Sequence, residues 1–328
     1  MKLVAFHSGR KNGNTEVFVK EALMAAEEMG IEVELYRLNE FEFTNCTACQ
    51  GFCPPEIDAC PHSKDEARVL VEAFLNSDGV IIASPCYSLP PNSLFYAFRD
   101  RVFGPKMDVS TVWELGFPEP SFAKGRFKTR PGGLIGVGGT LTENWTSLNI
   151  PGLFSATFSA QTDVVDHMNA YGVADATHAA ISDKWLERAH NLGKHVAEAM
   201  LSGDHSWRGE DEGTCPLCHE NMLLVTPGTN QICCPVCGIT GTIEVVDGVI
   251  QTTWPDDWEH RKDNRLSPKG KRTHMEEIDA CAAAFEPRKE EAKEKMKKYL
   301  NYTACEMKSP AKEARKAELL EKYGKKDS

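Results

Sequence analysis

Short apolar runs alternate with stretches of helical spacing along the first 201 residues. The predicted strands lie at 3–6, 31–36, 80–83, 134–137 and 162–165. Helical spacing follows the first strand as far as Gly30, and further helices are predicted at 64–76, 92–103 and 177–201. Strands that alternate with helices form a parallel sheet covered on both faces. The pattern therefore predicts an α/β domain over residues 1–201.

The pattern changes after residue 201. Residues 202–213 are polar and contain glycine, which predicts a linker. Residues 214–253 combine four cysteines with short strand-like runs and predict a small metal-binding domain. From 254 to 328 the chain is rich in Ala, Glu and Lys with helical spacing, which predicts a helical tail that packs on the body or on a partner.

Composition and charge narrow the class of protein. Hydrophobic residues make up 41% and charged residues 26% of the 328 positions, as in soluble globular proteins. No secretory leader or membrane-length apolar run is present, which predicts a cytoplasmic protein without a membrane partner. The net charge is −11. From Asp256 onward 19 Lys and Arg oppose 16 Asp and Glu, leaving −14 on the remainder, so nucleic acid is not an expected partner.

A polar loop, residues 7–15, lies between the first strand and the helix that follows. Glycines allow backbone N–H groups to converge on an anion, and a helix N-terminus adds a favourable dipole. Ser8, Asn12, Asn14 and Thr15 offer donors, and Arg10 adds charge. The loop predicts a phosphate site at the carboxyl edge of the sheet. An ordinary capped helix is the alternative interpretation, with Asn14 or Thr15 as the N-cap.

Three loops together resemble those of the NADPH-dependent FMN reductase and iron–sulfur flavoprotein family. The first loop resembles the family's Ser-x-Arg-x-x-Gly-Asn-Thr phosphate loop, with Gly9 where proline is usual. Residues 84–87, Ser-Pro-Cys-Tyr, resemble a Ser-Pro-x-Tyr that edges the flavin, and 98–101 resemble a helix that ends in Asp-Arg. Glycines at 136–139 follow the fourth strand.

The resemblance covers residues 1 to about 201 and implies a flavodoxin-like, doubly wound sheet of five parallel strands in the order 2-1-3-4-5, with FMN as cofactor. The residues expected to bind FMN are Ser8, Arg10, Asn12, Asn14, Thr15, Pro85, Cys86, Tyr87, Gly138, Gly139 and Thr140. Glycines in the third loop would let the backbone approach a flat ring closely. No side chain is required as an acid or base, since FMN supplies the chemistry.

A first cysteine group, C-x2-C-x3-C-x6-C, follows the second strand. Its members are Cys46, Cys49, Cys53 and Cys60. Four thiolates in one loop match the ligand set of a cubane cluster, and the resemblance implies a 4Fe-4S cluster that passes electrons to FMN. The middle gap of three residues departs from the family's usual two. A metal-free, cysteine-rich loop over the flavin or a dimer contact is the alternative.

A second cysteine group, C-x2-C-x15-C-x2-C, has zinc-ribbon spacing. Its members are Cys215, Cys218, Cys234 and Cys237. Two paired thiolate knuckles predict a tetrahedral site, with Zn favoured over a rubredoxin-type iron. Cys233 adjoins Cys234 and leaves the identity of one ligand open.

These features predict an FMN-dependent oxidoreductase. An iron–sulfur flavoprotein that reduces a small acceptor with electrons from NAD(P)H or ferredoxin is the favoured hypothesis. The alternatives are an electron carrier and a redox-sensing module that uses the ribbon and the basic tail. The expected assembly is a homodimer or homotetramer.

Overall fold

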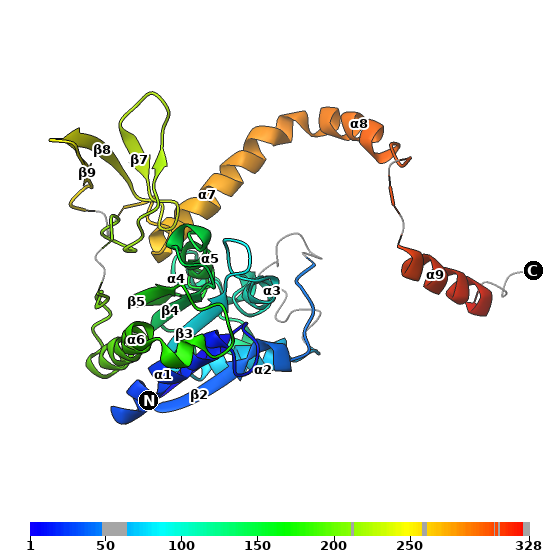
Figure 1. The fold of residues 1–328 in the computed structure, drawn as a ribbon. Helices are drawn as coiled ribbons and strands as arrows, with labels where there is room; N and C mark the ends of the chain where they lie inside the picture. Colours follow the sequence, from blue (N-terminus) through cyan, green and yellow to red (C-terminus); the bar gives the residue numbers. More distant parts are fainter. Residues whose placement is uncertain (48–63, 211–212, 258–260, 305, 308, 324–328) are drawn as a thin grey trace, which may run out of the picture. The chain divides into compact units, whose positions relative to one another are not determined.

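The computed structural model describes residues 1–47, 64–210, 213–257, 261–304, 306–307 and 309–323. The chain divides into two compact units (Figure 1), Met1–His274 and Met275–Ser328. Each unit is described by itself below.

The first unit is built on a parallel sheet. Its strands are β1 (Lys2–His7), β2 (Glu32–Arg37), β3 (Gly79–Pro85), β4 (Arg130–Val137) and β5 (Thr162–Ala170). They lie in the order β2-β1-β3-β4-β5, and all neighbours are parallel. The predicted flavodoxin-like fold and strand order are confirmed. The carboxyl ends of β1, β3 and β4 therefore meet at one edge of the sheet, where the three predicted loops begin.

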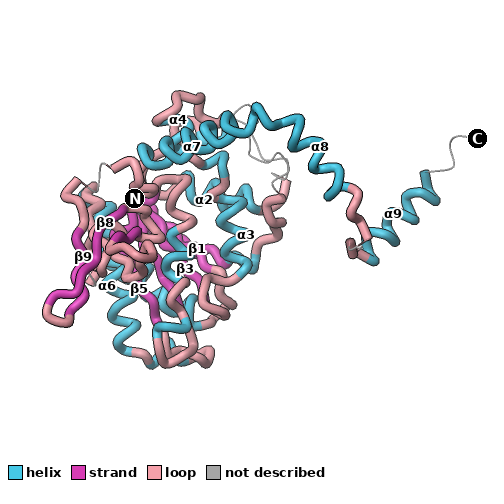
Figure 2. Tube along the Cα trace, turned by 90° about the horizontal axis from the view of Figure 1, so that it is seen from above, coloured by secondary structure: helices cyan, strands magenta, loops and turns pink. Residues whose placement is uncertain are grey.

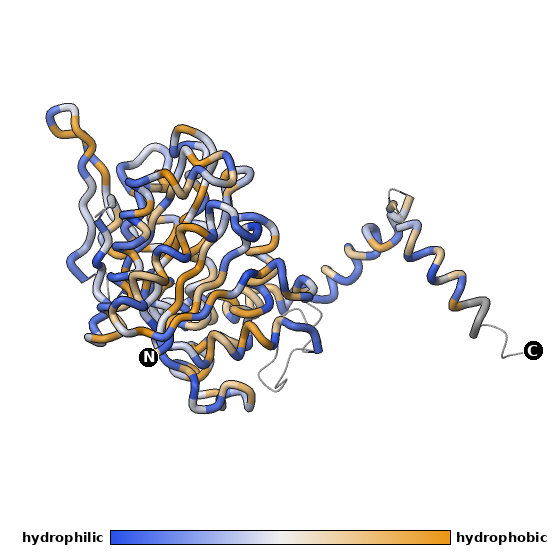
Figure 3. The backbone as a smooth tube through the Cα atoms, turned by 60° about the horizontal axis from the view of Figure 1, so that its bottom comes forward, coloured by the Kyte–Doolittle hydropathy of each residue, from blue (hydrophilic) through white to orange (hydrophobic). Residues whose placement is uncertain are grey.

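Two hydrophobic layers cover the sheet because alternate side chains of a strand point to opposite faces. Leu3 and Ala5 pack with helices α1 (Asn14–Glu28) and α6 (Asp183–Ser202) on one face. Val4 and Phe6 pack on the other face, against α2, α3 and α5. These helices span Ala67–Leu75, Ser93–Val102 and Asn149–Phe154, and a short helix α4 spans Val109–Trp113. Figure 3 shows hydrophobic colours gathered in the interior of this unit.

The helix predicted at 177–201 begins later than its pattern suggests. Residues His178–Ile181 form a 3-10 turn, and α6 begins at Asp183. The reason is a distant contact, because the Ala179 N–H donates to Asn14 Oδ1 at 3.1 Å. The helix ends as predicted, before Gly203, whose φ of 71° is left-handed.

A second sheet follows within the same unit. Its strands are β6 (Leu224–Val225), β7 (Gln231–Cys233), β8 (Thr240–Val246) and β9 (Val249–Thr253). They are antiparallel in the order β6-β7-β8-β9, and Figure 2 shows β8 and β9 as one hairpin. Val236 and Ile239 are buried in the same hydrophobic cluster as the α2–α3 face of the large sheet.

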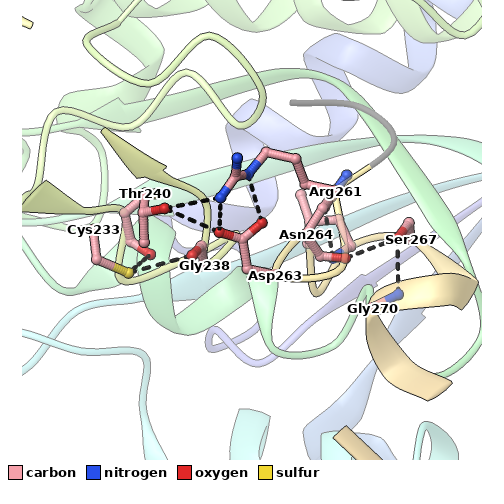
Figure 4. A network of polar contacts seen from close by, with 10 residues as sticks. Cys233, Gly238, Thr240, Arg261, Asp263, Asn264, Ser267 and Gly270 are labelled. Atoms are coloured by element: carbon pink, nitrogen blue, oxygen red, sulfur yellow. Dashed lines mark hydrogen bonds and ion pairs between the residues drawn. The ribbon is translucent and has the colours of Figure 1, made fainter. Parts of the chain in front are cut away.

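A polar network joins the small sheet to the start of α7 (Pro268–Phe285), as Figure 4 shows. Asp263 accepts from Thr240 Oγ1 at 3.1 Å and pairs with Arg261 at 2.8 Å. Ser267 Oγ donates to the Asn264 carbonyl at 2.8 Å. A Cβ at Gly270 would lie 1.9 Å from that carbonyl oxygen, so only glycine fits there.

The second unit contains the end of α7 and helices α8 (Lys289–Leu300) and α9 (Pro310–Tyr323). Ion pairs three or four residues apart line α8, including Arg288–Glu291 and Lys293–Glu290. Such exposed pairs contribute little to stability, because water and salt screen their attraction. Among the described residues of the whole chain, no helix is long and apolar enough to cross a membrane.

Candidate flavin and metal sites

The loop after β1 ends at an uncapped helix. Gly13 is the N-cap of α1 and provides no side chain, and the first intrahelical bond runs from the Val17 N–H to the Gly13 carbonyl at 3.1 Å. The N–H groups of residues 14–16 are those that a first helical turn leaves without intrahelical partners. Three donors at the positive end of the helix dipole could together bind an anion.

Asn12 and Gly9 determine the path of the loop next to this helix end. Asn12 has a left-handed φ of 56°, and its N–H donates to Glu16 Oε2 at 3.0 Å. A Cβ at Gly9 would lie 2.9 Å from the Thr15 Cβ, so the loop passes directly over the buried Thr15. Glycine at position 9, unusual for the family, is explained by this close approach. Arg10 is exposed, and its Cγ lies beside Gly13.

The Asn14 side chain is engaged within the protein. Its Nδ2 donates to the carbonyls of Val173 and Asp175, both at 2.7 Å, and its Oδ1 accepts from the Ala179 N–H. Both N–H donors of this buried amide are thereby used within the protein. Asn14 fixes the phosphate loop to the segment after β5, and it offers no side-chain donor to a phosphate.

Ser8 is a second positioning residue. Its hydroxyl donates to Ser84 Oγ at 2.8 Å, and its carbonyl accepts from Asn92 Nδ2 at 2.9 Å. Asn92 also caps α3, because its Oδ1 accepts from the Phe95 N–H at 3.1 Å. The loops after β1 and β3 are thus joined. We did not identify Asn92 from the sequence, although an Asn before a helical run is a recognisable N-cap signal.

A buried charged cluster lies beneath the loop. Glu16 is fully buried and receives two bonds from Arg37, at 2.8 and 2.9 Å, and one from Lys20 at 2.7 Å. The Arg37 guanidinium holds the pKa of Glu16 well below its usual range. His7, whose Nε2 lies 3.7 Å from Glu16, has no hydrogen-bond partner at either ring nitrogen among the residues that the structure describes. Burial lowers the pKa of His7 to about 4.

The loop after β3 presents aromatic and thiol groups. Pro85 ends the strand, and Tyr87 is 71% exposed. The half-buried Cys86 donates from Sγ to the Trp145 carbonyl at 3.4 Å. Burial raises the pKa of the Cys86 thiol, which favours the neutral form. Trp145, 60% exposed, belongs to the loop after β4. The loops after β3 and β4 therefore adjoin each other, with large rings facing solvent.

The glycines after β4 pack closely against the protein itself. A Cβ at Gly138 would lie 2.2 Å from the Thr146 Cγ2, and one at Gly139 would lie 3.1 Å from the Ala174 Cα. The Thr140 carbonyl accepts from the Gly172 N–H at 2.7 Å. The sequence predicts close approach of a flat ring at these glycines. In the structure the space that they leave is occupied by neighbouring residues of the chain.

The two ends of the first cysteine loop are joined by one arginine. Arg101 Nη1 donates to the Thr44 carbonyl and pairs with Asp65 Oδ2, both at 2.6 Å. Cys46, which follows Thr44, is exposed. The predicted ligands Cys49, Cys53 and Cys60 lie outside the described residues. Arg101 belongs to the Asp-Arg pair on which part of the family resemblance rests, and its position gives that pair a structural role.

The second cysteine group converges. The Sγ atoms of Cys215, Cys218, Cys234 and Cys237 all lie within 4.8 Å of one another, and all four residues are buried. His219 and Gly238 follow the two knuckles with left-handed φ values of 58° and 88°. The two knuckles are therefore alike, and His219 occupies the position at which glycine is expected. A buried S4 set of this size fits a tetrahedral metal ion.

Cys233 points away from this cluster. Its Sγ donates to the carbonyls of Cys234 and Gly238 at 3.5 and 3.4 Å, and Figure 4 shows the bond to Gly238. Cys234 follows the end of β7 and belongs to the set whose Sγ atoms converge, whereas Cys233 does not. The open choice between them is resolved in favour of Cys234.

Comparisons with known proteins agree with this geometry. A family model described as NADPH-dependent FMN reductase matches residues 1–143. An iron–sulfur flavoprotein of Methanocaldococcus jannaschii is 30% identical over 207 residues, which are 61% of this chain and 97% of the relative. The chain belongs to this flavoprotein family. It is accordingly an FMN-dependent oxidoreductase.

The similarity also extends beyond the flavodoxin-like region. A flavone synthase of Aspergillus candidus is 25% identical over 296 residues, 85% of this chain and 89% of the relative. The solved structure of a flavone reductase has a TM-score of 0.73 at 23% identity and covers 94% of this chain and 100% of its own. That structure shares the fold of this flavoprotein, including parts after residue 201.

Proposed function

We propose that this flavoprotein binds FMN at the edge formed by the loops after β1, β3 and β4, and uses it to reduce a small acceptor with NAD(P)H. The uncapped N-terminus of α1 is the observation that carries the proposal, because its three N–H groups fit a phosphate. The N–H groups of residues 14–16 would bind the phosphate, with Arg10 adding charge from the exposed side. Tyr87 and Trp145 would flank the ring. Bound FMN would supply hydride and electron exchange between donor and acceptor.

We propose a flat aromatic molecule as the acceptor. The support is the name of the flavone synthase that matches most of this chain, together with exposed rings at the proposed flavin edge. Tyr87 and Trp145 are 71% and 60% exposed. Leu141, in the same β4 loop as Trp145, is also exposed. Exposed apolar groups of this size around a cofactor edge are suited to contact a planar ligand.

The first cysteine group is proposed to hold a 4Fe-4S cluster that exchanges electrons with FMN. Relatives named iron–sulfur flavoproteins from two archaea support this proposal. Anaerobic purification followed by iron and sulfide analysis tests it. About four irons per chain that are lost in Cys49→Ala, with flavin retained, are expected. Anaerobic protein with flavin but no iron would leave a plain FMN reductase.

The second cysteine group is proposed to hold one Zn as a structural ion of a ribbon at 214–253. The two knuckles supply four thiolates and no open position, as in structural zinc sites. Iron at this position with a reversible reduction wave would instead make the ribbon a redox centre.

Steady-state kinetics test the function itself. Anaerobic turnover of a quinone or a flavone with NADPH or NADH is expected, and ferredoxin as the only effective donor would favour an electron carrier. The expected homodimer or homotetramer is measured separately, by light scattering of the FMN-loaded protein.

A further inference from the structure

A cavity of about 1090 Å³ lies beside the proposed flavin edge. Its walls are the carboxyl end of β5, the first half of α6, residues 213–222 of the first metal knuckle, and the β4 loop at 143–147. The same β4 loop contacts the β3 loop through Trp145 and Cys86. One loop therefore separates the cavity from the flavin edge, and the volume suits a small molecule.

Two rings in the cavity are held in fixed positions. Tyr171 and Trp185 meet edge to face with their centroids 5.2 Å apart. The Trp185 Nε1 donates to the Tyr171 carbonyl at 2.9 Å, and the Lys184 ammonium lies 4.4 Å from the Trp185 ring centroid. Fixed aromatic surfaces bind planar ligands with little loss of side-chain entropy.

The polar lining consists mainly of hydrogen-bond acceptors and amides. It includes Glu143, Asn144, Glu187, Asn191, Glu210 and Asn221. Two cations also line the cavity: Arg188 pairs with the buried Asp166 at 2.8 Å, and the Lys184 ammonium lies over the Trp185 ring. Carboxylates repel an anion such as the diphosphate of a dinucleotide, and they accept hydrogen bonds from hydroxyl groups.

The knuckle wall is braced against β5. His219 stacks on Trp207 with centroids 3.9 Å apart and an angle of 8° between the rings. His167 of β5 lies 5.0 Å from Trp207, and its Nε2 lies 3.2 Å from the Cys218 carbonyl. The segment that carries two of the four clustered cysteines is thus also a fixed wall of the cavity.

We propose that this cavity binds the hydroxyl-bearing end of a polyhydroxylated aromatic acceptor, with the first metal knuckle as a substrate-contacting element. The proposal rests on the proposed function and adds the place and the polar chemistry of acceptor recognition. The aromatic walls contact the ring, the carboxylates and amides accept from its hydroxyl groups, and the remainder of the molecule reaches over the β4 loop toward the flavin edge.

The test places a bulky side chain in the cavity at lining positions of α6. Asn191→Trp and Glu187→Trp both alter lining positions, whereas Lys194→Trp, on an exposed position of the same helix outside the lining, is the matched control. Binding of a trihydroxyflavone and of unsubstituted flavone to FMN-loaded protein is measured by calorimetry. Binding of the trihydroxyflavone should weaken about tenfold or more in the two lining variants and remain unchanged in the control.

Unsubstituted flavone should bind the wild type at least about tenfold more weakly than the trihydroxyflavone. Equal binding to all four proteins, equal binding of both flavones, or no binding to the wild type would overturn the proposal. NAD(P)H-driven ferricyanide reduction in the same preparations reports on the reductase separately. Its absence in wild type would refute the proposed function, whereas its presence with unaltered flavone binding would refute only this cavity assignment.

Discussion

The Asn14 Nδ2 lies 2.7 Å from the Val173 carbonyl oxygen, across 159 residues of sequence. This bond and its companion to Asp175 hold the phosphate loop against the segment after β5. The first side chain of α1 thus fixes the frame of the anion site, and the backbone of the same turn provides the donors.

Asn14 and Arg10 should therefore respond differently to truncation. Asn14→Ala removes a buried amide and leaves two carbonyls unsatisfied, so the free energy of unfolding should fall by about 1–3 kcal/mol even without FMN. Arg10→Ala should leave the stability of the apoprotein unchanged and weaken FMN binding by roughly tenfold or more, as expected for a lost charge-assisted bond. Urea unfolding of apoprotein and flavin titration measure the two effects. Full FMN affinity in Arg10→Ala would exclude it from the phosphate site.

His7 should make the free energy of unfolding fall more steeply as the pH is lowered. Its pKa is about 4 in the folded protein and near 6.5 when unfolded, so between these values the unfolded chain binds more protons and stability falls as pH falls. His7→Leu removes two unsatisfied ring nitrogens and should be neutral or stabilising at pH 7. Its stability should depend less on pH between 4 and 6.5, by up to one proton in slope. Unfolding curves across this range measure the effect, and an unchanged slope would contradict it.

Cys234, one of the four clustered cysteines, and its neighbour Cys233 provide two matched variants. Cys234→Ser should lose the bound metal and the fold of residues 214–253 while retaining flavin, because metal binding and folding of such a site are coupled. Cys233→Ser should keep one metal per chain, since its thiol faces the carbonyls of Cys234 and Gly238. Metal analysis of both variants decides, and equal metal loss would place Cys233 among the ligands.

Substitution of Arg101, which joins the two ends of the first cysteine loop, tests whether that loop holds a cluster. Arg101→Ala removes the bonds to Thr44 and Asp65 that join the two ends. We expect lower iron content after anaerobic purification, with FMN retained. Arg99→Ala on the same helix is the control, because Arg99 pairs with its neighbour Asp100. Identical iron content in both variants would argue against a role for this clamp.

The sheet could be predicted from sequence because its signals are local. Val80–Ala83 is a continuous apolar run, and such a run between polar turns is typical of a strand buried on both faces. The spacing of the four ribbon cysteines predicted their convergence for the same reason, since two knuckles need only a few residues each.

Other features depended on contacts that no local pattern contains. The role of Asn14 and the late start of α6 both result from bonds across more than 150 residues. The glycines at 138 and 139 were assigned to a ligand because their neighbours Thr146 and Ala174 come from later elements. The cavity beside β5 combines residues from four separate segments and was not predicted.

The central claim is that this chain binds FMN and reduces it with a nicotinamide donor. Anaerobic titration of the purified protein with NADPH or NADH, followed by release and identification of the flavin, tests it most directly. We predict one FMN per chain whose yellow absorption is bleached by about one equivalent of donor and restored by the acceptor. Protein that binds no flavin, or whose bound FMN stays oxidised with both nucleotides, would contradict the account.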